Sequence, residues 1–300
     1  MSDSHFVIVN GAAGGGRALQ RVADALQALR DAGIDAEVHR TQHPGHATEL
    51  AREAAAAGRR KFIAMGGDGT GFEVINGLFD AEPPETPFQL GLVPLGTGNS
   101  FLRDFDVTST EEAVSRIARG QSGPCDVLRV SHREGTLHYI NILSIGFSAA
   151  AGELTNRRFK AFGAAGYILA VVSSLASLQH PQDAIRIDGD ASVDDRKATL
   201  LSFSNSKFTG GAMMMAPNAD TSDGKLDVIR VGKLSRMALL RAFPRIFQGT
   251  HLTMPVVEEH QARRVDFVTE REQAVMIDGE ILNLALRSIE VVPGALELYQ

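Results

Sequence analysis

Short apolar runs alternate with amphipathic stretches along the first 125 residues. The runs have the length and the branched side chains of buried strands, and the stretches between them repeat apolar residues at helical spacing. Strands that alternate with helices are typical of a parallel sheet covered by helices. The predicted strands lie at residues 6–9, 36–39, 62–65 and 90–93, and the predicted helices at residues 19–29, 50–57, 70–79 and 109–120. We therefore predict an α/β domain over residues 1–125.

The second half has a different pattern, in which most apolar runs are short and end at turn residues. The predicted strands lie at residues 127–130, 137–142, 184–187, 199–203, 226–231, 264–268, 274–277 and 288–292, and the predicted helices at residues 161–178 and 235–247. The pairs Asp223-Gly224 and Asp278-Gly279 carry the commonest short hairpin signal. We predict a mostly antiparallel β-sandwich domain over residues 126–300, with its last strand packed back on the first domain and an active site in the cleft between the domains.

One loop in the first half carries the strongest chemical signal. Gly66, Gly67, Asp68, Gly69 and Thr70 separate an apolar strand from a helix. Glycines leave backbone N–H groups accessible, and such groups at a helix N-terminus bind anions, phosphate in particular. A carboxylate beside a polyphosphate needs a cation between them, so Asp68 predicts Mg²⁺. The alternative is a plain strand-to-helix turn, because Gly and Asp are both common in turns.

Two pairs of residues have the spacing of a capping box, in which a Ser or Thr side chain and a Glu side chain satisfy the first amides of a helix. They are Thr70 with Glu73, and Ser109 with Glu112. The spacing predicts that one helix begins near Thr70 and another near Ser109.

Composition narrows the class of protein. The 30 Lys and Arg residues against 36 Asp and Glu residues give a net charge of −6, and the chain has no basic block, so we expect no nucleic-acid partner. Cys125 is the single cysteine, which excludes an intramolecular disulfide and a cysteine metal site. The N-terminus lacks the basic flank and long apolar region of a signal peptide, so we expect a cytoplasmic protein.

Residues 161–178 contain no charged side chain and follow Arg157, Arg158 and Lys160. Their length meets the lower limit for a membrane span, but their glycines and serines make them weakly apolar. We interpret the segment as a buried helix or as a helix that contacts a membrane surface, with a spanning helix as the third alternative.

Two common nucleotide motifs are absent. Residues 11–18 lack the Gly-Lys-Ser/Thr ending of a P-loop, and no loop has the spacing G-x-G-x-x-G. A second Gly-rich loop, which contains Gly96, Thr97 and Asn99, follows the strand at residues 90–93. Because loops at the carboxyl ends of parallel strands share one edge of a sheet, we expect the Gly-rich loops to converge on one ligand.

These motifs together resemble the diacylglycerol kinase catalytic-domain superfamily. The matching segments are Gly-Gly-Asp-Gly-Thr at residues 66–70, Pro-Leu-Gly-Thr-Gly-Asn-Ser-Phe at 94–101, Asn-Ile-Leu-Ser-Ile-Gly-Phe at 141–147, Ala-Pro-Asn-Ala-Asp-Thr-Ser-Asp-Gly-Lys-Leu-Asp at 216–227 and Asp-Gly-Glu at 278–280. They span nearly the whole chain, and its length is most like that of the bacterial lipid kinases related to diacylglycerol, sphingosine and ceramide kinases. The resemblance implies transfer of the γ-phosphoryl group of ATP to a lipid hydroxyl.

The resemblance also implies roles for single residues. Glu280 would be the general base that takes the proton from the lipid hydroxyl, and Asp68 would lie near the catalytic Mg²⁺. A structural Mg²⁺ would bind the side chain of Asp223 and the main-chain carbonyls of Asp220 and Lys225. The implied nucleotide contacts are Asn10, Thr41, Gly66, Gly67, Asp68, Gly69, Thr70, Gly96, Thr97 and Asn99. The loop after Asn10 departs from the family pattern Asn-Pro-x-Ser-Gly, since it lacks the Pro and the Ser.

We thus expect a lipid substrate at the membrane surface, peripheral association with the inner face of the membrane, and a homodimer as a further option. Two alternatives stay open. One is an NAD kinase-like phosphotransferase, which also uses Gly-Gly-Asp-Gly but calls for a Gly-Asn-x-Gly-Phe second loop. The other is a non-catalytic protein that binds a nucleotide or a lipid.

Overall fold

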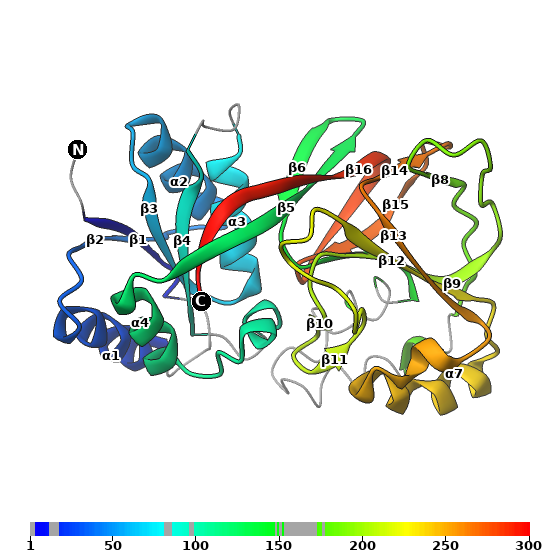
Figure 1. Cartoon of the computed structure of the whole chain (residues 1–300), viewed down its shortest axis with the longest axis horizontal. Coiled ribbons are helices and arrows are strands. Elements are labelled where there is room, and N and C mark those ends of the chain that lie inside the picture. The colour runs from blue at the N-terminus through cyan, green and yellow to red at the C-terminus, as the bar shows by residue number, and fades with distance from the viewer. Residues whose placement is uncertain are drawn as a thin grey trace. The chain divides into compact units, whose positions relative to one another are not determined.

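The computed structural model describes residues 4–11, 18–80, 86–95, 99–147, 149, 152, 173–175 and 178–300. The chain divides into two compact units (Figure 1). Unit 1 contains Met1–Asp126 and Gly294–Gln300, and unit 2 contains Val127–Pro293. Strands β5 (Ser122–His132) and β16 (Glu280–Tyr299) have residues in both units.

Unit 1 is built on a parallel sheet in the order β16-β4-β3-β1-β2. Its strands are β1 (His5–Val9), β2 (Ala36–Arg40), β3 (Lys61–Gly66), β4 (Phe88–Pro94) and the end of β16. Its helices are α1 (Ala18–Asp31), α2 (His46–Ala56), α3 (Asp68–Leu78), the 3-10 helix η2 (Phe101–Phe105) and α4 (Thr110–Arg119). The α/β architecture predicted from the apolar runs is confirmed.

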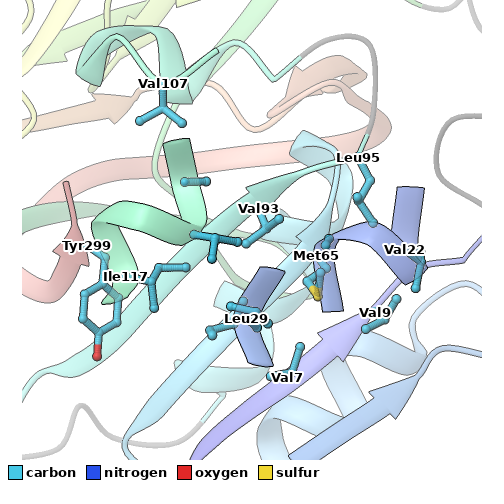
Figure 2. Close-up of a cluster of buried hydrophobic side chains, with 14 of the residues drawn as sticks. Val7, Val9, Val22, Leu29, Met65, Val93, Leu95, Val107, Ile117 and Tyr299 are labelled. Carbon is cyan, nitrogen blue, oxygen red and sulfur yellow. The ribbon is translucent and has the colours of Figure 1, made fainter. Parts of the chain in front are cut away.

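Helices cover both faces of this sheet. On one face α1 and α4 enclose an apolar cluster into which alternate residues of β1, Val7 and Val9, project (Figure 2). On the other face α2 packs against α3, and a side chain at Gly77 would clash with the carbonyl of Thr48 and lie 2.7 Å from the Cβ of Ala51. Glycine at position 77 therefore lets the two helices approach closely.

The two capping-box predictions have different outcomes. Ser109 is the N-cap of α4, where its hydroxyl accepts the N–H of Glu112, and Gly120 ends that helix at φ 66°. By contrast α3 begins at Asp68 with Gly67 as its N-cap, so the prediction that Thr70 caps this helix was wrong. The carboxylate of Glu73 instead accepts the N–H groups of Gly45 (3.1 Å) and Ala47 (3.2 Å) and caps α2.

Unit 2 contains an antiparallel sheet in the order β13-β12-β9-β7-β15-β16, which β14, β8, β5 and β6 extend through β16. These strands and the short pair β10-β11 are β6 (Gly135–Tyr139), β7 (Ile142–Gly146), β8 (Ile185–Ile187), β9 (Ala198–Ser204), β10 (Phe208–Thr209), β11 (Met213–Met214), β12 (Leu226–Gly232), β13 (Val257–Ala262), β14 (Arg264–Phe267) and β15 (Glu272–Ile277). The predicted antiparallel character of the second half is confirmed.

Three details of unit 2 differ from the sequence prediction. The strand predicted at residues 137–142 is interrupted at Ile140 and Asn141, which separates β6 from β7. Asp223-Gly224 joins no hairpin, because the strand that follows it, β12, pairs with β9 and β13. Strand β13 was missed, since its sequence Val-Glu-Glu-His-Gln-Ala is mostly polar.

The helix predicted at residues 235–247 is α7 (Arg236–Ala242) followed by the 3-10 helix η6 (Phe243–Gln248), and η7 (Thr250–Thr253) comes next. Residues 161–172 and 176–177 of the second predicted helix lie outside the described residues, as do Arg157, Arg158 and Lys160. Within the part of the chain that the structure describes, no helix is long and apolar enough to span a membrane.

Candidate active site

Three backbone hydrogen bonds connect the carboxyl ends of the four parallel strands β1, β2, β3 and β4. Asn10 donates its N–H to the carbonyl of Met65 (2.9 Å), and Thr41 donates to the carbonyl of Val9 (3.0 Å). Leu95, which opens the second Gly-rich loop, donates to the carbonyl of Gly66 (2.8 Å). The predicted nucleotide residues Asn10, Thr41 and Gly66 therefore lie at one edge of the unit 1 sheet.

Glycine at position 66 is a steric requirement of this edge. A Cβ there would lie 2.5 Å from the Cβ of Thr70 and closer still to its hydroxyl. That hydroxyl accepts the Nδ2 donor of Asn10 at 3.1 Å. The side chain of Thr70 thus contacts both Gly66 and Asn10. This contact joins the first Gly-rich loop to the end of β1 at the start of α3.

The start of α3 has the character of an anion site. Gly67, the N-cap, is extended and supplies no side-chain cap. Thr70 and Gly71 donate their N–H groups to the carbonyl of Gly67, while the amides that precede them at Asp68 and Gly69 have no helical acceptor. Such amides and the helix dipole favour a negatively charged ligand.

The Asp68 carboxylate lies beside these amides and is held by the second loop. Its Oδ2 accepts the N–H of Ser100 at 3.1 Å. Burial raises the pKa of Asp68, although hydrogen bonds from Ser100 and Phe101 oppose the rise. A carboxylate whose charged form is disfavoured fits a bound divalent cation, because the cation would supply the missing counter-charge.

The second loop is described only at its ends. Gly96 and Thr97 lie outside the described residues, whereas Asn99 has the left-handed φ of 43° and leads through buried Ser100 into η2. Arg21 of α1 donates to the carbonyl of Leu95 at 3.1 Å. Sequence analysis assigned no role to Ser100, although Ser100 lies in the motif at residues 94–101, and it missed Arg21, which belongs to no motif.

Glu280 lies on a rigid hairpin of unit 2. It opens β16 directly after the two-residue turn Asp278-Gly279, with Ile277 paired to Glu280 across the turn. Asp278 and Gly279 have φ values of 46° and 88°, the positive values that this type of turn requires. The predicted hairpin is confirmed, and the Glu280 side chain is exposed at its tip.

Asp278 explains how this turn is fixed. Its buried carboxylate accepts three consecutive backbone N–H groups, from Ile140 (3.2 Å), Asn141 (3.1 Å) and Ile142 (3.0 Å). These amides lie where β6 ends and β7 begins, so the same contacts account for the interruption of the predicted strand. The motif at residues 278–280 and the motif that starts at Asn141 therefore form one structure.

The predicted structural Mg²⁺ loop is ordered by its own carboxylates. Asp220 accepts the N–H and the hydroxyl of Ser222, and Asp223 accepts the N–H of Lys225 at 2.9 Å. Lys225 also donates through Nζ to Gln261 of β13 (3.0 Å). Asp223 keeps one carboxylate oxygen toward solvent and Gln261, so the loop can offer it to a hard cation.

A carboxylate at the end of the motif at residues 216–227, to which sequence analysis gave no role, is buried nearby. Asp227 of β12 is 1% exposed, and its Oδ1 has no hydrogen-bond partner among the described residues. Burial first, and then the carboxylates of Glu259 and Asp223, raise the pKa of Asp227 to about 7. The motif contains Asp227, but its burial could not be read from the motif, because it depends on which face of β12 the side chain occupies.

Another group with metal-ligand potential is His43, His46 and Glu49, whose ligand atoms lie within 4.8 Å of one another. Nδ1 of His46 already accepts the N–H of Gln42 (3.0 Å), and the two imidazole rings are stacked with centroids 4.7 Å apart. Stacked rings cannot both direct a lone pair at one ion, so we assign no metal to this group.

Comparisons with known proteins agree with these motifs. Residues 4–130 match the model of the diacylglycerol kinase catalytic domain, and residues 141–300 match that of the YegS C-terminal NAD kinase beta sandwich-like domain.

Related proteins align along nearly the whole chain. A Mycobacterium tuberculosis protein named diacylglycerol kinase is 28% identical, over 97% of this chain and 93% of its own length. A Xanthomonas euvesicatoria protein named "Probable lipid kinase YegS-like" is 29% identical over 100% and 97%. A crystal structure from Bacillus anthracis, described as a "putative diacylglycerol kinase", is 27% identical with a TM-score of 0.79 over 99% of this chain and 97% of that one. The chain therefore belongs to the family of lipid kinases that join a diacylglycerol kinase catalytic domain to a YegS C-terminal domain.

Proposed function

We propose that this protein is an ATP-dependent kinase that transfers the γ-phosphoryl group to a hydroxyl of diacylglycerol or a related lipid. The observation that carries the proposal is the start of α3, where helix amides without a helical acceptor and the Asp68 carboxylate lie together at the edge of a parallel sheet. A phosphate and a cation are the pair of ligands that such a site suits.

On the donor side, the backbone of Gly67, Asp68 and Gly69 at the start of α3 cradles the phosphates of ATP. Asp68 would hold Mg²⁺, and the ion would supply positive charge beside the phosphate oxygens. The remaining nucleotide contacts are Asn10, Thr41, Gly66, Thr70, Gly96, Thr97 and Asn99. The side chain of Asp223 and the main-chain carbonyls of Asp220 and Lys225 would hold a second, structural Mg²⁺.

On the acceptor side, Glu280 is the general base. Its carboxylate takes the proton of the lipid hydroxyl while that oxygen bonds to the γ-phosphorus, and the bond from this phosphorus to the β–γ bridging oxygen breaks to leave ADP. The exposure of Glu280 at the tip of a fixed turn supports this role, because a base needs both access and a defined position.

Names of relatives support diacylglycerol as the acceptor. Relatives from Mycobacterium tuberculosis and Bacillus subtilis are named diacylglycerol kinase, whereas the Xanthomonas relatives are named only as lipid kinases. Because acyl chains confine such substrates to bilayers, the protein would work at the membrane surface, bound peripherally to its cytoplasmic face.

The test is transfer of label from γ-labelled ATP with Mg²⁺ to a panel of acceptors: diacylglycerol, monoacylglycerol, ceramide, sphingosine, phosphatidylglycerol and NAD. We expect label in diacylglycerol or a close analogue. Label in NAD alone would assign the activity to an NAD kinase-like enzyme, an alternative that the description of the C-terminal domain keeps relevant. ATP binding with no labelled product would instead indicate a non-catalytic protein.

A further inference from the structure

Helices α7 and η6 form an outward surface of unit 2 (Figure 1). Neither helix contains a buried residue. Their inner side is nevertheless fixed, because Ala238, Leu239 and Ile246 pack against a buried apolar cluster that includes Ile229 and Val231 of β12. The surface is therefore a firm part of the fold with one side left to solvent.

Large apolar side chains project from this outer side. Met237 is 55% exposed, Leu240 41% and Phe247 40%. They are three of the six large apolar residues that are exposed among those the structure describes, and they fall within eleven consecutive positions. Such a concentration marks an interaction site more often than chance exposure does.

Positive charge surrounds these apolar tips. Lys233, Arg236, Arg241 and Arg245 are all exposed, and the sequence has no acidic residue from position 232 to position 257. The chain as a whole has a net charge of −6, so this positive region is a local exception. An anionic surface would attract it and repel most of the rest of the molecule.

We propose that this surface, defined by Lys233, Arg236, Met237, Leu240, Arg241, Arg245 and Phe247, docks on an anionic phospholipid bilayer. Cations interleaved with large apolar tips suit the headgroup boundary, where the charges meet lipid phosphates and the tips enter the acyl region. A second copy of the chain is disfavoured, because a symmetric contact would bring four cations against four others. The proposal rests on the proposed function, because a kinase that acts on lipids has to bind the bilayer that contains them.

A fluorescence experiment tests the contact directly. The chain has no Trp, so Phe247→Trp places a single reporter in the surface. Val268→Trp is the matched control, since Val268 is an exposed apolar residue of unit 2 outside the surface (51% exposed). With vesicles of phosphatidylglycerol and phosphatidylcholine, we expect a blue shift and quenching by brominated acyl chains for the Phe247→Trp variant only. Pure phosphatidylcholine vesicles should give little of either.

A charge reversal tests the electrostatic part. Arg241→Glu should lower the partition onto anionic vesicles by roughly tenfold or more, since each basic side chain near an anionic surface contributes appreciably to binding. Arg263→Glu, at an exposed arginine outside the surface, should change it much less. Added salt should weaken wild-type binding.

Several outcomes would overturn the proposal. In the fluorescence experiment they are an unshifted Phe247→Trp emission with anionic vesicles and an equal blue shift of the Val268→Trp variant. In the charge-reversal experiment, an equal loss of vesicle binding in Arg241→Glu and Arg263→Glu would do so. A blue shift of Phe247→Trp with duplex DNA in place of vesicles, or one that follows protein concentration alone as a dimer would give, would also overturn it. Turnover of dispersed dioctanoylglycerol should be the same in Arg241→Glu and wild type. If the wild type binds vesicles through this surface but phosphorylates no lipid, the proposed function fails and the docking surface stands.

Discussion

In the first Gly-rich loop, the side chain of Thr70 leaves no room for a Cβ at Gly66. We predict that Gly66→Ala destabilises the protein by roughly 1–3 kcal/mol, because the new methyl group overlaps Thr70 and neither backbone can move freely at the start of α3. ATP binding should weaken as well, since Thr70 and the Asn10 contact would be displaced. Urea unfolding and nucleotide titration measure the two effects.

Gly71→Ala is the matched control for this substitution. Gly71 lies in α3 next to Thr70, but its Cβ would meet only the side chain of Leu92 at an ordinary 3.7 Å. This variant should be neutral or slightly stabilising, since Ala favours a helix more than Gly does. Equal stability of the Gly66 and Gly71 variants would show that the steric argument is wrong.

Asp227 should make stability depend on pH. Its pKa rises from an ordinary 3.8 to about 7 in the folded protein, so folding favours the protonated form. The stabilisation is complete below pH 4 and is lost as pH rises through 7, by up to about 4 kcal/mol at 1.36 kcal/mol per pKa unit. Relative to wild type, Asp227→Asn should be near neutral at pH 4 and more stable at pH 8. An equal difference in unfolding free energy at both values would contradict this account.

Helices and strands were predictable where the signal was local. Ser109 and Glu112 satisfied amides of their own helix, as their spacing predicted, but Thr70 and Glu73 with the same spacing did not. The carboxylate of Glu73 found unsatisfied amides at the start of α2 instead, and a spacing of three residues cannot reveal a partner 26 to 28 positions away. Polar β13 was missed for the same reason, because its strand character depends on pairing with β12.

The β15–β16 turn should depend on the Asp278 carboxylate. Asp278→Ala leaves three buried N–H groups without an acceptor, so we predict a loss of at least about 3 kcal/mol in unfolding free energy. Asp188→Ala is the control: Asp188 also has positive φ and accepts two N–H groups, from Arg263 and Arg264, but it is exposed and water can replace it. Similar losses in the two variants would refute the importance of burial.

At the scale of the whole molecule, the sequence motifs predicted the two-part architecture and the family. Hydrophobic periodicity distinguished a parallel first half from an antiparallel second half, and both assignments are confirmed. What the motifs could not predict were the contacts that join them, such as Asp68 with Ser100 and Asp278 with the amides before β7. Those contacts form between segments whose separation along the chain is 32 to 138 residues, and no local pattern encodes them.

The central claim is that the chain transfers a phosphoryl group to a lipid with Glu280 as base. The most direct test measures diacylglycerol phosphorylation and ATP affinity side by side in wild type, Glu280→Gln and Glu272→Gln, an exposed control at the start of β15. We predict that Glu280→Gln lowers turnover by about 10²–10⁴-fold, the usual contribution of a general base, while ATP affinity and the Glu272 variant stay at wild-type values. Wild-type turnover in Glu280→Gln would contradict the account.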